Sequence, residues 1–523
     1  MTAEGAAVAG APSRIEGGVD AIVVGASADG LVAAAYLARA GLKTVLFENA
    51  ADIGLPVRRR AYGGDKHGVD AEHLVFTLDP QVIDDLELYR HGVSFAARRL
   101  DTVYFFDDHE ALHVSGDVRN AANDIDDDDE AAAFTTFLED VFEASSFLRP
   151  LFSGAAGRDF KKAFNTASPA LARRLNWMMT ASVDDVMASY LSEGRLRTAM
   201  TAETVFRTSS APHEAMSFAG LLAKWSGEVA GLQAACGVPE GGVTVVIDAL
   251  RRAAQAANVD IRASSAVRQI LIEKDRAAGV SMEGGGQVRA PIVVAAGDAR
   301  QVFLSLVGPG ALDVAFQQDV AAMTPKTATA QLHLALRGSP RDEETRANMA
   351  RRLVFAPPLE ALRASFSNAR QGEVSDGLII EAIFPQVFDQ EAVNSKMQIL
   401  SVMAHPLPFD ENPEKDRQEE IRTAILSGLE KFAPSISKRI EADQLVLASD
   451  APAVGDGRAS AFAARPGVVR QLALASLCAS GGRIGGLYFC GPESQIGAGL
   501  NGAAGRNAAR AALQKFTRAG GAP

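Results

Sequence analysis

The stretch that decides the fold reads Val19-Asp20-Ala21-Ile22-Val23-Val24-Gly25-Ala26-Ser27-Ala28-Asp29-Gly30-Leu31-Val32-Ala33-Ala34-Ala35-Tyr36. An apolar β-run ends in a glycine-containing turn, and an alanine-rich helical run follows at once. A second strand over 41–48 then finishes on Glu48, which comes 23 residues after Gly25. An acidic residue at about this distance binds the ribose of a dinucleotide. The sequence therefore predicts a βαβ dinucleotide-binding unit.

Each position of this turn has a physical role. Gly25 permits the tight exit from the strand, and Gly30 lets the helix pack closely on the sheet. Ser27 stands where the usual G-x-G-x-x-G pattern has its middle glycine, so its Cβ narrows the approach to a pyrophosphate while its hydroxyl can donate to one. Asp29 adds a negative charge that suits the helix dipole but repels a bound diphosphate. The turn thus predicts the fold, with substitutions at the positions nearest the ligand.

Length and charge narrow the class of protein. A chain of 523 residues with 47% apolar and 22% charged residues is typical of a globular protein of two or three domains. A net charge of −12 disfavours nucleic acid and an anionic bilayer as partners. Apolar runs stay below the ~18 residues of a membrane-spanning helix, and residues 1–18 lack the pattern of a signal peptide.

Cysteine and histidine spacing argues against a disulfide redox centre or a metal site. Cys236, Cys478 and Cys490 form no C-x-x-C, and the eight histidines are scattered without metal-ligand spacing. Few cysteines and no secretory signal favour a cytoplasmic protein. The acidic run over 123–130 lacks the glycine and ligand spacing of a calcium loop, so we expect it to cap a helix.

The central region, from Ala131 to about Trp225, shows helical periodicity with apolar stripes. One stripe contains Phe134, Phe137, Leu138, Val141, Phe142 and Phe147, and another contains Leu171, Leu175, Met178 and Met179. Such stripes usually form core. In an enzyme that handles lipids they can instead line a substrate tunnel, here one that opens toward Leu500, and the sequence leaves both readings open.

Two further groups of strands follow. Runs at 259–262, 267–273, 278–282 and 292–296, preceded by a helix over 243–257, predict a mixed α/β continuation of the nucleotide-binding unit. Runs at 328–336, 377–384 and 397–405 predict a second sheet, and helices resume over 412–432.

The C-terminal region carries the second marker. A strand over 486–491 runs into a turn with Gly491, Gly497, Gly499, Gly502 and Gly505, and a helix over 506–513 follows. Free backbone N–H groups in such a turn can face an anion or a ring oxygen. We expect 19–48 and 486–513 to form one discontinuous domain, with both glycine turns at the same edge of a parallel sheet.

With both ends in view, the chain resembles the phytoene desaturase-like flavoproteins, which include carotenoid desaturases and isomerases within the wider amine-oxidase class of FAD enzymes. It is most similar to the branch that contains pyridine nucleotide-disulphide oxidoreductase domain-containing protein 2. The motifs that carry the resemblance are Val24–Gly41, Ser210–Glu214, Pro239–Gly242, Val267–Ile270 and Cys490–Ala509. The resemblance covers nearly the whole chain.

The resemblance implies FAD as cofactor and a set of contacts for it. Gly25, Ser27 and Gly30 would contact the diphosphate, Glu48 the adenosine ribose, Val267 the adenine, Gly491 the ribityl-phosphate, and Gly499 and Leu500 the isoalloxazine ring. Departures from the family pattern fall on these cofactor positions: Ser27, Ala28-Asp29, Leu55, Gln495-Ile496 and Ala498.

The predicted fold class is α/β, a discontinuous Rossmann-type FAD-binding domain with a second, sheet-plus-helical-cap substrate domain. The expected boundaries are a disordered tail over 1–17, an FAD-binding domain over 18–75, 235–300 and 480–517, and a substrate domain over 76–234 and 301–479. No catalytic acid or base is assigned, since His213 and His333 read more readily as structural histidines.

The leading hypothesis is an FAD-dependent oxidoreductase that desaturates, dehydrogenates or isomerises an apolar, polyene or isoprenoid-like substrate. The alternative is a non-catalytic or cofactor-free member that acts as a binding or assembly subunit. A soluble amine oxidase ranks last, because no aromatic pair stands near Gly499. The expected partner is a small hydrophobic substrate, and peripheral membrane contact and a homo-oligomer are compatible with the sequence.

Overall fold

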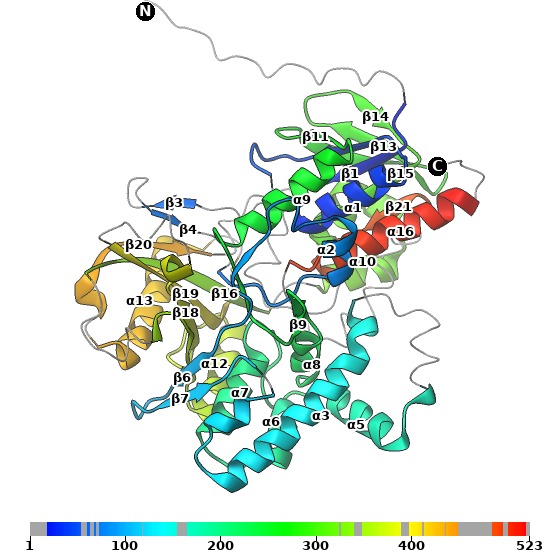
Figure 1. The fold of residues 1–523 in the computed structure, drawn as a ribbon. Helices are drawn as coiled ribbons and strands as arrows, with labels where there is room; N and C mark the ends of the chain where they lie inside the picture. The colour runs from blue at the N-terminus through cyan, green and yellow to red at the C-terminus, as the bar shows by residue number, and fades with distance from the viewer. Residues whose placement is uncertain are drawn as a thin grey trace, which may run out of the picture.

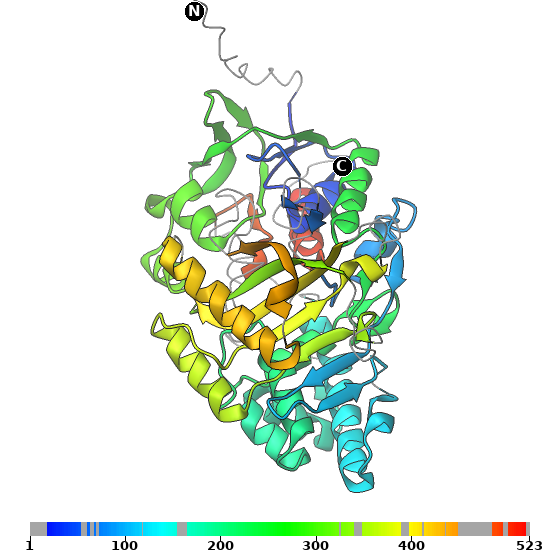
Figure 2. The same cartoon turned by 90° about the vertical axis from the view of Figure 1, so that its left-hand side faces the viewer.

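The computed structural model describes residues 18–53, 60–62, 67–69, 73–117, 119–153, 165–323, 326–338, 348–388, 397–410, 413–434, 436–447, 484–494 and 500–518. Two sheets organise this part of the chain, a five-stranded parallel sheet in one lobe and a seven-stranded mixed sheet in the other. Helices cover the mixed sheet on both sides, and the C-terminal helix returns to the lobe of the N-terminal strand (Figures 1 and 2).

The parallel sheet draws its strands from three distant segments of the chain. Its order is β11 (Asp260–Arg262), β2 (Thr44–Phe47), β1 (Ala21–Val24), β15 (Ile292–Ala295) and β21 (Leu487–Phe489), and every neighbouring pair is parallel. Numbered along the chain, this is the order 3-2-1-4-5 of a doubly wound fold, with its switch point between β1 and β15. The predicted fold class is confirmed.

Each face of the parallel sheet buries a different layer. Alternate side chains such as Val23 and Val294 pack against α1 (Ala28–Arg39), α9 (Thr244–Ala256) and α16 (Ala503–Arg518). The opposite side chains, such as Ile22 and Val293, pack against the small antiparallel sheet of β12 (Val267–Glu273), β13 (Arg276–Met282) and β14 (Gln287–Arg289), a π-helical turn η2 (Arg300–Val307) and α10 (Val314–Ala321). Burial on both faces explains why these strands read as continuous apolar runs.

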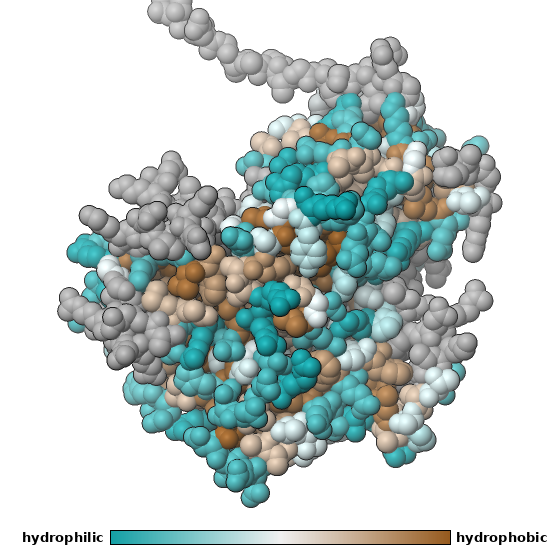
Figure 3. All heavy atoms as spheres, viewed as in Figure 1, coloured by the Kyte–Doolittle hydropathy of each residue, from teal (hydrophilic) through white to brown (hydrophobic). Residues whose placement is uncertain are grey.

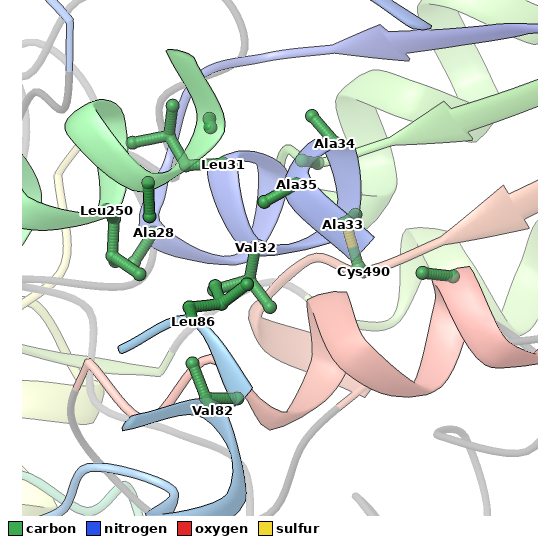
Figure 4. Packing of buried hydrophobic residues seen from close by; sticks show 14 of the residues in the cluster. Ala28, Leu31, Val32, Ala33, Ala34, Ala35, Val82, Leu86, Leu250 and Cys490 are labelled. Atoms are coloured by element: carbon green, nitrogen blue, oxygen red, sulfur yellow. The ribbon is translucent and has the colours of Figure 1, made fainter. Parts of the chain in front are cut away.

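Helix α1 fits between its neighbours because it is rich in alanine. In Figure 4, Val32 points toward Val82 and Leu86, which lie in and directly after α2 (Pro80–Asp85), while Ala28 lies near Leu250 of α9. Small side chains let α1 and α16 approach closely. This close approach explains why glycine stands at position 505, in the first turn of α16. A Cβ placed on Gly505 would overlap the carbonyl oxygen of Asp29.

The mixed sheet has the strand order β20-β16-β19-β18-β17-β6-β7. Its strands are β20 (Ile440–Val446), β16 (Thr327–Arg337), β19 (Met397–Pro408), β18 (Ile379–Ile383), β17 (Arg352–Phe355), β6 (Thr102–Phe105) and β7 (Ala111–Val114). The pair β17 and β6 is parallel and the other pairs are antiparallel. The second sheet predicted from 328–336, 377–384 and 397–405 is confirmed.

One face of the mixed sheet is mainly apolar. Leu332, Leu334, Ile380 and Val402 belong to a core that also holds Ile425 of α13 (Lys415–Phe432). Figure 2 shows α13 lying across this face of the sheet.

The other face is covered by a helical layer. It consists of α3 (Asp128–Phe152), α5 (Pro169–Thr180), α6 (Val183–Tyr190), α7 (Arg195–Val205), α8 (Ala219–Trp225) and α12 (Leu359–Arg370). The acidic run caps this layer as expected, since Asp127 accepts a hydrogen bond from the Glu130 N–H at 2.8 Å at the start of α3. Among the described residues, no helix is long and apolar enough to cross a membrane.

Short elements complete the described chain. They are α2 (Pro80–Asp85), the strand pairs β3 (Arg60–Tyr62) with β4 (His67–Val69), β5 (Phe95–Ala97) with β10 (Val238–Pro239) and β8 (Glu228–Val229) with β9 (Leu232–Gln233), and the 3₁₀ turns η1 (Ala121–Asp124), η3 (Pro309–Ala311), η4 (Pro385–Phe388), η6 (Ile436–Arg439) and η9 (Pro492–Ser494).

The C-terminal helix differs from its prediction over 506–513. It begins at Ala503, because the Asn501 side chain accepts a hydrogen bond from the Ala503 N–H at 2.8 Å and ends the preceding turn. The proposed domain boundaries stay a prediction.

The close approach of α1 and α16 yields a stability prediction. We expect Gly505→Ala to lower the free energy of unfolding by about 2 kcal/mol, because its methyl group overlaps backbone rather than a movable side chain. Gly284→Ala is the control, since a Cβ there meets nothing within 4 Å. Equal urea midpoints for the two variants would contradict the close packing.

Candidate functional site

Three glycines lie at the carboxyl end of the parallel sheet. Gly25 follows β1 with a φ of 97°, a value that favours glycine, and Gly297 and Gly491 follow β15 and β21. A Cβ on Gly491 would overlap the Gly297 carbonyl oxygen. The two glycine-rich turns therefore start at the same edge of one sheet, on either side of the switch point, where ligands of doubly wound folds bind.

Ser27 acts as the N-cap of α1. Its Oγ accepts a hydrogen bond from the Gly30 N–H at 3.3 Å. The hydroxyl proton stays available as a donor, and the other N–H groups of the first helical turn have no partner within the helix. The residue that replaces the middle glycine thus keeps an anion-binding helix start in place.

Asp29 has a partner that its sequence neighbourhood does not reveal. Its Oδ1 accepts a hydrogen bond from the Gly505 N–H at 3.0 Å, across 476 positions of the chain. The first turn of α16 carries the positive end of that helix dipole, which offsets part of the aspartate charge. The repulsion expected between Asp29 and a diphosphate is therefore weaker than the sequence alone indicates.

Glu48 is buried, with 4% of its surface exposed, and it holds the turn. Its two carboxylate oxygens accept hydrogen bonds from the Ala26 N–H at 2.7 Å and the Ala50 N–H at 2.9 Å. Burial raises the pKa of the carboxyl, although these bonds act in the opposite direction. Each oxygen keeps a further lone pair, so a ribose hydroxyl can still donate to it.

The remaining expected contacts are placed in part. Val267 is buried at the start of β12, close to β2, since the Ser265 N–H donates to the Glu48 carbonyl at 2.7 Å. Leu500 is half-buried against the core of the parallel sheet. Gly499, Leu55 and 495–498 lie outside the described residues. The structure therefore brings Gly25, Ser27, Gly30, Glu48 and Gly491 together at one edge, with Val267 beside it.

These residues fit a dinucleotide cofactor. A Cβ on Gly30 or Gly491 would overlap the backbone of this edge, so these glycines let its turns lie close together. The α1 N-terminus provides donors for a diphosphate, and Glu48 provides an acceptor at ribose distance along the sheet edge. This combination defines a dinucleotide-binding fold.

The chain belongs to the family of flavin containing amine oxidoreductases, whose pattern matches residues 30–513. FAD is accordingly its cofactor, and its class is oxidoreductase. The chain is 24% identical to the rat pyridine nucleotide-disulfide oxidoreductase domain-containing protein 2, over 94% of this chain and 92% of that protein. It is 26% identical to the zeta-carotene-forming phytoene desaturase of Myxococcus xanthus, over 55% of each.

Solved structures share the fold. Putrescine oxidase bound to putrescine aligns with a TM-score of 0.62 at 14% identity, over 96% of this chain and 99% of that one. An oxidoreductase from Methanosarcina mazei aligns with a TM-score of 0.60 at 16% identity, over 95% and 100%.

The face of the mixed sheet that lies opposite α13 carries a band of buried polar side chains, which the sequence analysis missed. Its members are Thr327, Thr329, Gln331, His333, Arg352, Glu381, Ser401, His405 and Thr102. In β16 the signal was present, because Thr327, Thr329, Gln331 and His333 alternate with the apolar residues that face α13.

Arg352 is the centre of this band. Its Nε donates to Glu381 and its Nη1 donates to Glu203 of α7 at 2.7 Å. Lys224 of α8 forms an ion pair with the other oxygen of Glu203, and the Tyr104 hydroxyl donates to Glu203 at 3.1 Å. The band therefore joins the sheet to the helical layer through charged hydrogen bonds.

Burial and neighbouring charge have opposite effects on the pKa values of the carboxyl groups in this cluster. Burial alone raises the pKa of the Glu203 and Glu381 carboxyls, but the Arg352 charge between them holds both pKa values below the usual range. Burial raises the pKa of the nearby Cys236 thiol to about 12. Both carboxylates are thus charged at neutral pH and the thiol is protonated.

A cavity of about 70 Å³ adjoins the cluster. Its wall is mainly apolar, with Phe76, Leu138, Met200 and Trp225, and its polar residues include Glu203, Lys224 and Arg352. The lining residues come from both the helical layer and the mixed sheet, so the cavity lies where the two meet.

The apolar stripes of the helical region pack as core. Phe134, Phe137, Leu138 and Val141 of α3 are buried together with Leu175 and Met178 of α5. A tunnel that opens toward Leu500 stays a prediction, because the neighbouring 495–499 lie outside the described residues. His213 is exposed, whereas His333 is buried in the polar band.

On the face shown in Figure 3, hydrophobic residues gather where the lobe of the parallel sheet meets the rest of the molecule. Segment 73–79 connects the mixed sheet to the lobe of the parallel sheet. The His73 ring lies 3.0 Å from Glu381 in the mixed sheet, and the Asp79 N–H donates to the Asn501 carbonyl before α16 at 2.9 Å. The polar band and the glycine edge are therefore joined by one short stretch of chain.

The two hydrogen bonds of Glu48 predict that a substitution at this position weakens FAD binding. We expect Glu48→Gln to weaken FAD binding about tenfold, because the amide nitrogen cannot accept from one of the two N–H groups that Glu48 holds. Titration of apo-protein with FAD measures this. The control is Glu273→Gln, which removes an exposed partner of Arg289, and equal affinities of the two variants would refute the role of Glu48.

His405 predicts a pH dependence of stability. Burial lowers its pKa from 6.5 to about 4, so the unfolded chain binds a proton at this site between these values while the folded chain does not. The contribution of His405 is complete above pH 6.5 and is lost on acidification to pH 4, a change of about 3 kcal/mol. Unfolding free energies of His405→Gln should fall less over this range than those of the native chain, whereas the exposed His213→Gln should behave as the native chain does.

Proposed function

We propose that the chain uses FAD either to remove hydride from a mainly apolar substrate, in a desaturation or dehydrogenation, or to isomerise it, the substrate being a polyene or isoprenoid-like compound. The observation that carries the proposal is the cavity beside Phe76, whose wall is mainly apolar and which segment 73–79 connects to the glycine edge. Two relatives with matching stretches are named as desaturases of phytoene and hydroxyneurosporene.

The two sheets of this chain would have different roles, one in binding the cofactor and the other in binding the substrate. Gly25, Ser27, Glu48 and Gly491 would hold the cofactor, which supplies an acceptor for hydride. The mainly apolar wall of the cavity favours a hydrocarbon part of the substrate.

Amine oxidation is the second reaction of this family to consider, because putrescine oxidase shares the fold. The cavity disfavours it, since Arg352 and Lys224 balance the charges of Glu203 and Glu381 and leave no negative charge to bind a substrate ammonium group. We therefore favour oxidation at carbon of an uncharged substrate.

The test begins with the visible spectrum of the purified protein and the mass of the cofactor released on denaturation. The protein is then mixed without oxygen with phytoene in detergent micelles or with putrescine. We expect bound FAD, and bleaching of the flavin absorbance by phytoene and not by putrescine.

Two outcomes would overturn the proposal. Bleaching by putrescine alone would assign the chain to amine oxidation. A colourless protein that takes up no added FAD would instead support the binding or assembly subunit.

A further inference from the structure

The charged end of the cavity is electrically balanced. Glu203 and Glu381 contribute two negative charges, and Arg352 and Lys224 contribute two positive ones. Lys224 and Arg352 also lie over the Phe76 ring, at 4.5 and 5.6 Å from its centroid. An added charge of either sign would leave this buried cluster unbalanced, which is costly away from water.

His73 extends the hydrogen-bond network from Glu381 to the neighbouring strand. Its Nε2 lies 3.0 Å from the Glu381 carboxylate and donates to it. Its Nδ1 lies 2.9 Å from the Ser401 Oγ, and Ser401 in turn accepts from the Gln331 amide at 3.2 Å.

The cluster nevertheless has N–H donors that have no acceptor among the described residues. Arg352 is 3% exposed and uses Nε and Nη1 for its carboxylates, and its Nη2 has no hydrogen-bond partner in the described part of the chain. Lys224 has three N–H donors and one carboxylate partner among the described residues. Both residues line the cavity, so these donors are available to an acceptor that binds there.

We propose that the cavity binds an uncharged hydrogen-bond acceptor of the substrate, a carbonyl or hydroxyl oxygen, through Arg352 Nη2 and Lys224 Nζ. The apolar wall holds the carbons next to this oxygen. A volume of about 70 Å³ is room for about five water molecules, which suits a polar group with a few attached carbons. The inference rests on the proposed function and narrows it to polyene or isoprenoid-like substrates that carry such an oxygen, whereas phytoene, a hydrocarbon, would contact the apolar wall alone.

The test uses three probes of equal size on the purified holoprotein. Butyramide carries a neutral carbonyl, butyrate an anion and butylammonium a cation. We expect calorimetry to show butyramide binding, with the two charged probes at least about tenfold weaker, as the balanced cluster requires.

Matched lysine variants locate the binding. Lys224→Met removes one donor set and should weaken butyramide about tenfold. Lys431→Met is the control, because Lys431 is also a lysine over a phenylalanine, 5.6 Å from the Phe355 ring, but on the α13 face of the sheet. Binding of butyramide that both variants leave unchanged would overturn the proposal, as would equal binding of all three probes.

A second measurement keeps the proposal testable if Lys224→Met does not fold. The chain has two tryptophans, and Trp225 lines the cavity while Trp177 lies on α5. In Trp177→Phe, butyramide should shift the remaining emission, and an unchanged emission at saturating probe would refute the site. Neither readout requires turnover, so a failed phytoene reaction leaves this result interpretable.

Discussion

The contact between the first turns of α1 and α16 is the constraint on which the site depends. One hydrogen bond from Gly505 to Asp29, and the absence of a Cβ at Gly505, let two helix starts from opposite ends of the chain lie together. Because β21 precedes α16, the same contact brings Gly491 beside Gly297. Formation of the glycine edge therefore closes the chain between these segments into one long loop, which costs conformational entropy.

A second link joins the two layers of the other lobe. The Arg352 side chain binds a carboxylate from β18 and one from α7, so that a helix and a sheet share a buried ion pair. Such pairs add little net stability over apolar packing, but removal of one partner is costly. We infer that the cluster sets the position of the helices on the sheet, and that the cavity beside it inherits its shape from this alignment.

The sequence predicts features that depend on neighbours along the chain. The βαβ unit, the helix cap at Asp127 and the strands of the mixed sheet all follow from local periodicity and turn residues. Apart from the polar residues that alternate in β16, the polar band could not be predicted, because its partners meet only in three dimensions: His73 and Glu381 are 308 positions apart, and Arg352 and Glu203 are 149 apart. For the same reason the sequence assigns Asp29 to repulsion, whereas its partner Gly505 comes near the other end of the chain.

The difference between the two faces of the mixed sheet also favours the native register of its strands. Side chains alternate along a strand, so a slip of one residue in β17 or β18 would turn Arg352 or Glu381 into the apolar layer under α13. An unpaired charge in that layer has no partner and is strongly unfavourable. The free energy of a misregistered pairing is therefore raised at each central strand. In this way the charged band favours the native strand register during assembly of the sheet.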